Sequence, residues 1–318
     1  MTENWAADAR WFEYSRAANP IGSGRVPAIP MARFPASLHA DRPTGVVPLD
    51  VGVELGVDGV VGSGPVTSPG LCASFIRIRP GDRLTTRPTA TSELYYVWRG
   101  CGSSEVDGRI LQWESGDVFV LPGGCESIHQ ATEDVTMYWV TDEPLLRHLG
   151  VAPVTRRFEP TLFPAARTEL ELEAVVAAPH ADDRNRLSVL LSTAPNDQIQ
   201  TVTNVLWAMV GLLPVGAVQR PHRHQSAALD LITACEPGCY TLVGRAIDER
   251  GEICQPTRVD WEPGGAFITP PGLWHAHHNE SGAPARLFPV QDAGLHTYLR
   301  SLDIRFAPPF RSADSHER

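Results

Sequence analysis

Three histidines in the last third of the chain have a spacing that suits a metal site. His222 and His224 are separated by one residue, and His275 follows later. Residues i and i+2 of a β-strand face the same side, so on a strand the first two imidazoles project together, and a third could join them from a neighbouring strand. Imidazole nitrogen binds iron, copper, zinc, nickel and manganese. A His-x-His pair alone is as often two ordinary imidazoles, so the surrounding pattern has to decide.

The segments around these histidines are short runs of β-branched and aromatic residues between Gly, Pro and Asp turns, and the same order occurs twice. The runs that repeat cover residues 73–79, 93–100 and 118–122 in the first half, and 206–214, 228–232 and 266–271 in the second. Helical patterns are sparse, and they cover residues 5–18, 145–149, 168–178 and 292–302. This pattern predicts an all-β protein of two small barrels or sandwiches with a few peripheral helices.

The composition excludes several classes of protein. The 318 residues include 27 Lys and Arg against 37 Asp and Glu, a net charge of −10 that disfavours nucleic acid as a partner. No run resembles a signal peptide or reaches the roughly 18 apolar residues of a membrane span. The six cysteines are therefore expected as reduced thiols rather than a disulfide framework. We expect a cytoplasmic protein with no nucleic-acid or membrane partner.

The spacing of glycines, prolines and histidines is similar to the two sequence motifs of the cupin superfamily. Gly216 is followed after five residues by His222-x-His224, and Gly264 is followed by Pro270-x-Gly272, His275 and Asn279 at the family's intervals. The family's glutamate, expected three or four residues after the second histidine, is replaced by Ala228 or Leu229. The resemblance implies a double-stranded β-helix, or jelly-roll, barrel whose metal is held by His222, His224 and His275.

The first half has the same framework without the ligands. Arg87-Pro88-Thr89 occupies the His-x-His position, and Ser127 stands where the third histidine would be. We therefore predict a structural first barrel without metal, and we interpret nearby His129 as an ordinary hydrogen-bonded residue. The predicted domains are a covering segment (1–65), barrel 1 (66–150), a linker (151–200), barrel 2 (201–305) and a tail (306–318).

Among two-barrel cupins the chain resembles the group of gentisate, salicylate and 1-hydroxy-2-naphthoate dioxygenases. The resemblance rests on the stretches 94–100, 116–122, 222–224, 268–277 and 291–295. It implies a mononuclear Fe(II), a small hydroxyaromatic carboxylate that chelates it, O₂ as second substrate, ring cleavage, and a homodimer or homotetramer. A dication without an anionic protein ligand would be neutralised by a doubly anionic chelate. His277, two residues after His275, is then expected to hydrogen-bond oxygen or substrate in catalysis.

Five further residues are candidates for contacts with the substrate. Arginines pair with carboxylates through two parallel hydrogen bonds, and Arg223 is the weakest such candidate because strand alternation points it away from the metal. The chain also departs from the family, with Ala276, Asp230 and His296 at positions where the family has other residues. The predicted substrate-binding residues are Asp292, Trp274, Arg245, Arg286 and Gln225.

Two other functions remain open from the sequence. Three histidines also suit Zn²⁺, Mn²⁺ or Ni²⁺, so a non-redox isomerase, epimerase or hydrolase is the first alternative. The second is a non-catalytic cupin that binds a ligand, although a purely structural metal site would normally close its coordination.

Overall fold

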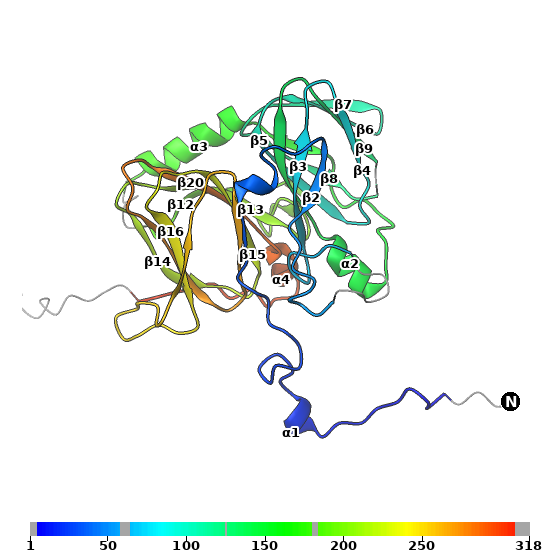
Figure 1. The fold of residues 1–318 in the computed structure, drawn as a ribbon, viewed down its shortest axis with the longest axis vertical. Helices are drawn as coiled ribbons and strands as arrows, with labels where there is room; N and C mark the ends of the chain where they lie inside the picture. The colour runs from blue at the N-terminus through cyan, green and yellow to red at the C-terminus, as the bar shows by residue number, and fades with distance from the viewer. Residues whose placement is uncertain (1–4, 58–63, 125, 180–183, 309–318) are drawn as a thin grey trace, which may run out of the picture.

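The computed structural model describes residues 5–57, 64–124, 126–179 and 184–308, and within them the chain forms two antiparallel β-barrels. Each barrel has an inner sheet that faces the other barrel and an outer sheet (Figure 1). The prediction of an all-β fold with few helices is confirmed. The described helices are α1 (Tyr14–Ala17), α2 (Glu143–Leu149), α3 (Ala165–Ala177) and α4 (Ala293–Tyr298), with short 3₁₀ turns at Ala36–Leu38 and Ala194–Asn196.

Barrel 1 is built mainly from the first half of the chain. Its inner sheet runs in the order β11 (Thr161–Phe163), β8 (Val118–Pro122), β5 (Ser92–Arg99), β10 (Val135–Thr141), β3 (Cys72–Ile78) and β2 (Gly45–Pro48). Its outer sheet runs in the order β4 (Arg83–Thr86), β9 (Ser127–Ala131), β6 (Gly102–Val106) and β7 (Arg109–Trp113).

Barrel 2 has the same design with one more outer strand. Its inner sheet runs in the order β1 (Arg33–Phe34), β18 (Ala266–Thr269), β15 (Ala228–Ala234), β20 (Ala285–Gln291), β13 (Trp207–Leu213) and β12 (Leu187–Leu191). Its outer sheet runs in the order β17 (Thr257–Asp260), β16 (Cys239–Gly244), β19 (Trp274–Asn279), β14 (Val218–Arg223) and β21 (Arg305–Phe306). The segments before and between the barrels thus add edge strands to both inner sheets.

Strand alternation creates separate cores from the same strands. In β15, Leu229 and Leu231 pack in the core between the two inner sheets, whereas Ile232 lies in the core inside barrel 2. In β10, Tyr138 faces the core between the sheets and Met137 the interior of barrel 1. Successive side chains of a strand point to opposite faces, so each inner sheet is buried on both sides. The outer sheet of barrel 2 carries the histidines.

The predicted helix over residues 5–18 is wrong for most of its length, because only Tyr14–Ala17 is helical. Its four aromatic residues, Trp5, Trp11, Phe12 and Tyr14, are 65% or more exposed, so little packing stabilises a longer helix. The helices predicted over 145–149 and 168–178 are confirmed and begin two or three residues earlier, whereas the one predicted over 292–302 is helical only at Ala293–Tyr298. Among the described residues, no helix is long and apolar enough to cross a membrane.

The two barrels meet closely at Gly264, which precedes β18. Its φ is +78°, and a Cβ atom built there would lie 2.5 Å from the Cη2 atom of Trp98 in barrel 1. The Trp98 ring is fixed because its indole N–H donates to the Thr233 carbonyl oxygen at 3.1 Å. Gly216 also has a positive φ, +71°, but a Cβ there would meet nothing within 4 Å.

This pair of glycines gives a matched test of the interface. Gly216→Ala should lower the free energy of unfolding by about 1–2 kcal/mol, the cost of a left-handed backbone for an L-residue. Gly264→Ala should lose a further ~1–3 kcal/mol because the methyl group overpacks against Trp98. Urea titrations of both variants would measure the difference. Equal losses in the two variants would contradict the tight contact between the barrels.

Candidate metal centre

Two neighbouring strands of the outer sheet bring the three histidines together inside barrel 2. His222 on β14 pairs directly with His275 on β19, and a register shift separates that pair from the Gln219 and His277 pair. His224 follows the end of β14. The three side chains are 2–4% exposed, and one potential ligand atom from each lies within 4.8 Å of the others. The local strand geometry thus gathers the three predicted ligand residues.

Hydrogen bonds orient all three imidazoles in the same way. Each Nδ1 atom lies near a backbone carbonyl oxygen, that of Arg220 for His222 (3.2 Å), of Ser226 for His224 (2.8 Å) and of Leu273 for His275 (3.2 Å). A carbonyl only accepts, so Nδ1 carries the hydrogen in each ring and Nε2 carries the lone pair. Three such Nε2 atoms are a donor set that fits a divalent transition metal.

The environment keeps these histidines neutral. Burial, more than any neighbour, lowers the pKa of His222 and His275 well below the ordinary value, and it lowers the pKa of His224 to about 4. Imidazole binds metal only in its neutral form. Because the three imidazoles are neutral at neutral pH, protons do not compete with a metal ion for their Nε2 atoms.

Arg186, which immediately precedes β12, lies beside the histidine cluster and was missed by the sequence analysis. Its Nη2 atom is 3.4 Å from Nε2 of His222 and 3.5 Å from Nε2 of His277, and it donates to the Gln219 side chain at 3.3 Å. Burial lowers the pKa of Arg186 to about 10, so it remains a cation at neutral pH. The only sequence signal was its place before the apolar run 187–191 in the predicted linker.

His277 also faces the interior, from the same strand as His275. Its ring centroid is 5.7 Å from that of His275, and its Nδ1 atom is 2.8 Å from the hydroxyl oxygen of Thr241 on β16. Trp261 donates its indole N–H to the same hydroxyl oxygen at 2.8 Å. His277 is therefore held by a side chain rather than by a carbonyl, unlike the other three histidines.

Comparison with solved structures identifies the fold. Salicylate 1,2-dioxygenase from Pseudaminobacter salicylatoxidans aligns with a TM-score of 0.68 over 95% of each chain, at 12% sequence identity. The chain has the bicupin fold. In sequence, this bicupin is 31% identical over 141 residues to a 5-aminosalicylate 1,2-dioxygenase from Comamonas sp., and 29% identical over 175 residues to a 1-hydroxy-2-naphthoate 1,2-dioxygenase from Nocardioides sp. strain KP7.

These matches are partial in length. They cover 42% and 54% of the bicupin, and only 37% and 41% of the two relatives. No protein-family model matches the chain. The relatives are enzymes that act on hydroxylated aromatic acids, as the resemblance in the sequence motifs led us to expect.

Of the predicted substrate-binding residues, two hold the segment that follows the metal-site strand β14. The Gln225 side-chain oxygen accepts from the Asp303 backbone N–H at 2.6 Å and so fastens the C-terminal segment to this end of the barrel. Asp292 accepts from the Ala227 backbone N–H at 2.9 Å, and burial raises the pKa of its carboxyl group to about 6. In the bicupin, both therefore have structural partners near His224.

The other three lie in different surroundings. Trp274 packs under Arg223, whose guanidinium carbon is 5.1 Å from the ring centroid. Arg245 is exposed just after Gly244, which pairs with Trp274. Arg286 is bound through two hydrogen bonds to Glu169 of α3, at 2.5 and 2.6 Å. It is at the opposite end of β20 from Gln291, roughly 17 Å along the strand, so the structure does not bring it to the histidine cluster.

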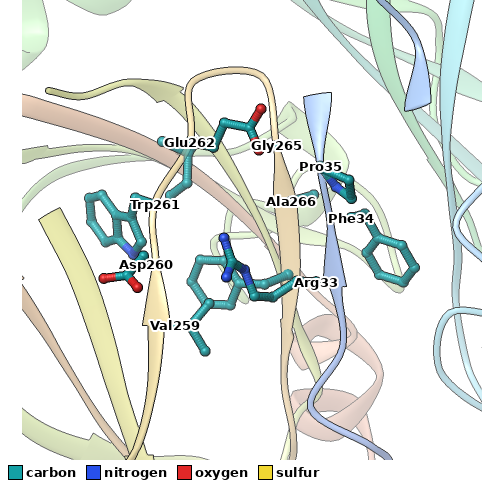
Figure 2. Close-up of a pocket in the computed structure, with 11 residues that line it drawn as sticks. Arg33, Phe34, Pro35, Val259, Asp260, Trp261, Glu262, Gly265 and Ala266 are labelled. Carbon is teal, nitrogen blue, oxygen red and sulfur yellow. The ribbon is translucent and has the colours of Figure 1, made fainter. Parts of the chain in front are cut away.

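Two pockets border barrel 2. One, of about 330 Å³, is lined by Arg184, Asn185, Arg186 and Gln219 together with the turn between β13 and β14. None of the three histidines lines this pocket, but its lining residue Arg186 contacts His222 and His277. The other, of about 310 Å³, has Arg33 of β1 and Trp261 among its lining residues, and Figure 2 shows the Arg33 side chain within it. The first pocket thus has two arginines, Arg184 and Arg186, in its lining.

The equivalent region of barrel 1 is occupied by a buried polar chain. Thr86 pairs with Ser127, as His222 pairs with His275 in barrel 2, so Thr86 takes the position that the sequence spacing had assigned to Arg87. The Thr86 hydroxyl lies 3.0 Å from His129 Nε2 and 2.9 Å from the Tyr95 hydroxyl, which donates to Glu93 at 2.6 Å. His129 is thus a hydrogen-bonded core residue, as interpreted from the sequence.

Glu93 should make stability depend on pH. Burial raises the pKa of its carboxyl group to about 8, so between about 4.5 and 8 the folded state binds a proton that the unfolded state releases. The free energy of unfolding therefore falls as the pH rises through this window. We expect the Glu93→Gln variant to gain melting temperature over wild type at pH 8.5 and to show no such gain at pH 5. A constant difference at both pH values would contradict a protonated Glu93.

Proposed function

We propose that this bicupin is an Fe(II)-dependent dioxygenase that inserts O₂ into a small hydroxyaromatic carboxylate and cleaves its ring, of the gentisate and salicylate type. The observation that carries the proposal is the combination of three neutral imidazole Nε2 donors with the adjacent cation Arg186. His222, His224 and His275 would hold the iron. The iron would supply a Lewis-acidic centre and the electrons needed to activate O₂.

Charge is the first support for a carboxylate substrate. The family's glutamate ligand is absent, so the protein leaves the charge of a divalent metal uncompensated. A hydroxy acid bound through its phenolate and carboxylate oxygens brings two negative charges. Arg186 adds a partly buried cation 3.4 Å from Nε2 of His222 and hydrogen-bonded to the Gln219 side chain. Its guanidinium would bind a carboxylate through two parallel hydrogen bonds.

The relatives are the second support. The 5-aminosalicylate and 1-hydroxy-2-naphthoate dioxygenases carry in their names the substrate class that this site suits, a ring with a hydroxyl group next to a carboxylate. In the proposed reaction both atoms of O₂ enter the product, and the ring bond between the carboxylate-bearing and the hydroxyl-bearing carbon breaks. Arg186 would bind the carboxylate, and His277 would donate a hydrogen bond to the substrate.

Oxygen consumption tests the function. The Fe(II)-loaded protein should consume one O₂ per molecule of substrate with at least one of gentisate, salicylate, 5-aminosalicylate or 1-hydroxy-2-naphthoate, and the aromatic absorbance should disappear at the same rate. Metal analysis of natively purified protein belongs to the same test. Full occupancy by zinc or manganese, with no O₂ uptake after iron loading, would overturn the proposal in favour of a non-redox enzyme or a ligand-binding protein.

Cellular location and assembly belong to the same proposal. The described cysteines, which exclude Cys125, are free thiols, as a reducing cytoplasm would keep them. We expect a homodimer or homotetramer, which sedimentation of the purified protein would measure.

A further inference from the structure

A tryptophan, a hydroxyl residue and a histidine are linked by hydrogen bonds in the same way in both barrels. In barrel 2 the Trp261 indole N–H donates to the Thr241 hydroxyl oxygen, which lies 2.8 Å from His277 Nδ1. In barrel 1 the corresponding atoms belong to Trp113, Ser104 and His129, with distances of 2.8 and 2.7 Å. We call each set a relay.

The two relays occupy equivalent places in the fold. His277 lies two residues after His275, and His129 lies two residues after Ser127, the residue at the third-ligand position of barrel 1. Each histidine is the direct cross-strand partner of its hydroxyl residue. The relay is therefore present in a barrel with the histidine triad and in one where Thr86 and Ser127 take the positions of His222 and His275.

The relay has a direction. An indole N–H can only donate, so it occupies a lone pair of the Thr241 oxygen and leaves the hydroxyl hydrogen for another acceptor. Among the described residues, the Thr241 hydroxyl has Trp261 and His277 as its hydrogen-bond partners. The hydroxyl hydrogen finds an acceptor only if it is donated to Nδ1 of His277. The hydrogen of the neutral His277 ring is then on Nε2.

This arrangement is the reverse of that in the three ligand histidines. There, carbonyl oxygens accept from Nδ1, and each Nε2 atom carries the lone pair that a metal would use. With the direction argued above, the Thr241 hydroxyl donates to Nδ1 of His277, and Nε2 carries a hydrogen. The relay thus explains why a fourth histidine beside the triad is not a fourth ligand.

In barrel 1 the series of hydrogen bonds that passes through the histidine ends on a carboxyl group of the protein. From His129 Nε2 it continues to Thr86, Tyr95 and the carboxyl group of Glu93, so the protein supplies the final acceptor. In barrel 2 the His277 Nε2 atom instead lies 3.5 Å from Nη2 of Arg186, which is also a donor. With Nε2 of His277 protonated, two donors lie side by side, and an anionic oxygen beside them would accept from both.

We propose that Trp261 and Thr241 are positioning residues that fix His277 as the Nε2–H tautomer, so that His277 and Arg186 together bind one carboxylate of the substrate. His277 then acts as a hydrogen-bond donor and not as a base or a metal ligand. The claim that the bound anion is a substrate carboxylate rests on the proposed function, whereas the tautomer of His277 does not.

Nitrogen NMR tests the tautomer without any turnover. Long-range ¹⁵N–¹H spectra of the ¹⁵N-histidine-labelled, Zn(II)-loaded full chain should show His277 protonated at Nε2, with its signal identified by its loss in His277→Gln. Thr241→Ser, which copies Ser104 of barrel 1, should retain this tautomer. Thr241→Val, which replaces the hydroxyl with a methyl group of similar size, should lose it. Protonation at Nδ1 in the wild type would overturn the proposal.

Gentisate binding tests the consequence. Under anaerobic conditions the Fe(II)-loaded Thr241→Val variant should bind gentisate about tenfold more weakly than wild type, or ~1.4 kcal/mol, and Thr241→Ser should bind within about twofold of wild type. An equal loss in both variants would overturn the positioning role. If wild type does not bind gentisate but shows the Nε2–H tautomer and its dependence on Thr241, the relay is supported and the proposed substrate class fails.

Discussion

His224→Ala should lower iron affinity by at least about 100-fold and abolish O₂ uptake, because removal of an inner ligand exceeds the loss from outer partners. The remaining two histidines lie on neighbouring strands and cannot close the coordination sphere on that side. Iron content after dialysis and O₂ uptake with gentisate would measure both effects. We expect the fold to remain intact, because the His224 side chain forms its hydrogen bonds only with nearby Ser226 among the described residues.

A matched control for this variant lies on strand β19. His278 follows His277 but faces away from the site, where its ring stacks on Tyr240 at a centroid distance of 4.7 Å. His278→Ala should therefore retain iron and activity near the wild-type level. Iron loss of similar size in both variants would show that the triad is not the binding site.

Arg186→Met should raise KM for gentisate by about 100-fold. The substitution removes a charge-assisted hydrogen-bonded pair that contributes ~3 kcal/mol to binding. Iron content should be unchanged, because Arg186 is a cation and cannot be a ligand. Steady-state O₂ uptake at several gentisate concentrations would separate KM from kcat. Arg186→Lys should recover only part of the loss, because an ammonium group cannot form the paired, planar contacts of a guanidinium.

Arg184 provides the control for charge alone. It lines the same pocket as Arg186 but is exposed. Arg184→Met removes the same charge from the approach to the site and should change KM by less than about threefold, as expected of a screened surface charge. Equal effects of the two substitutions would point to general electrostatic attraction in place of a specific carboxylate contact.

Much of the fold followed from the sequence because its turns require particular residues. Gly116 and Gly264 have φ angles of +90° and +78°, which favour glycine, and they mark the same turn in the two barrels. The strands between such turns alternate or are continuously apolar, as sheets with one or two buried faces demand. The triad was predictable for a similar reason, since strand periodicity and motif spacing fix where His222 and His275 must point.

Other parts of the site depend on contacts that local patterns do not encode. Arg186 reaches the cluster because β12 adds to the edge of the inner sheet, and a lone arginine before an apolar run gives no sign of that pairing. Thr241 was indistinguishable from any strand threonine until its cross-strand partner was known to be His277. Arg286 was a reasonable candidate from charge alone, but its partner, Glu169, lies on a helix 117 positions earlier in the chain.

In each barrel the inner sheet packs against the other barrel, whereas the candidate metal ligands of barrel 2 lie on or next to the outer sheet. The packing between barrels uses residues of the inner sheets, whereas the histidine triad depends mainly on two outer strands. Substitutions on the outer strands can therefore add or remove a metal site with little effect on how the halves fit together. Thr86 and Ser127 already form the cross-strand pair that His222 and His275 form in barrel 2. Histidines substituted at these two positions would therefore lie side by side, as the start of an engineered metal site in barrel 1.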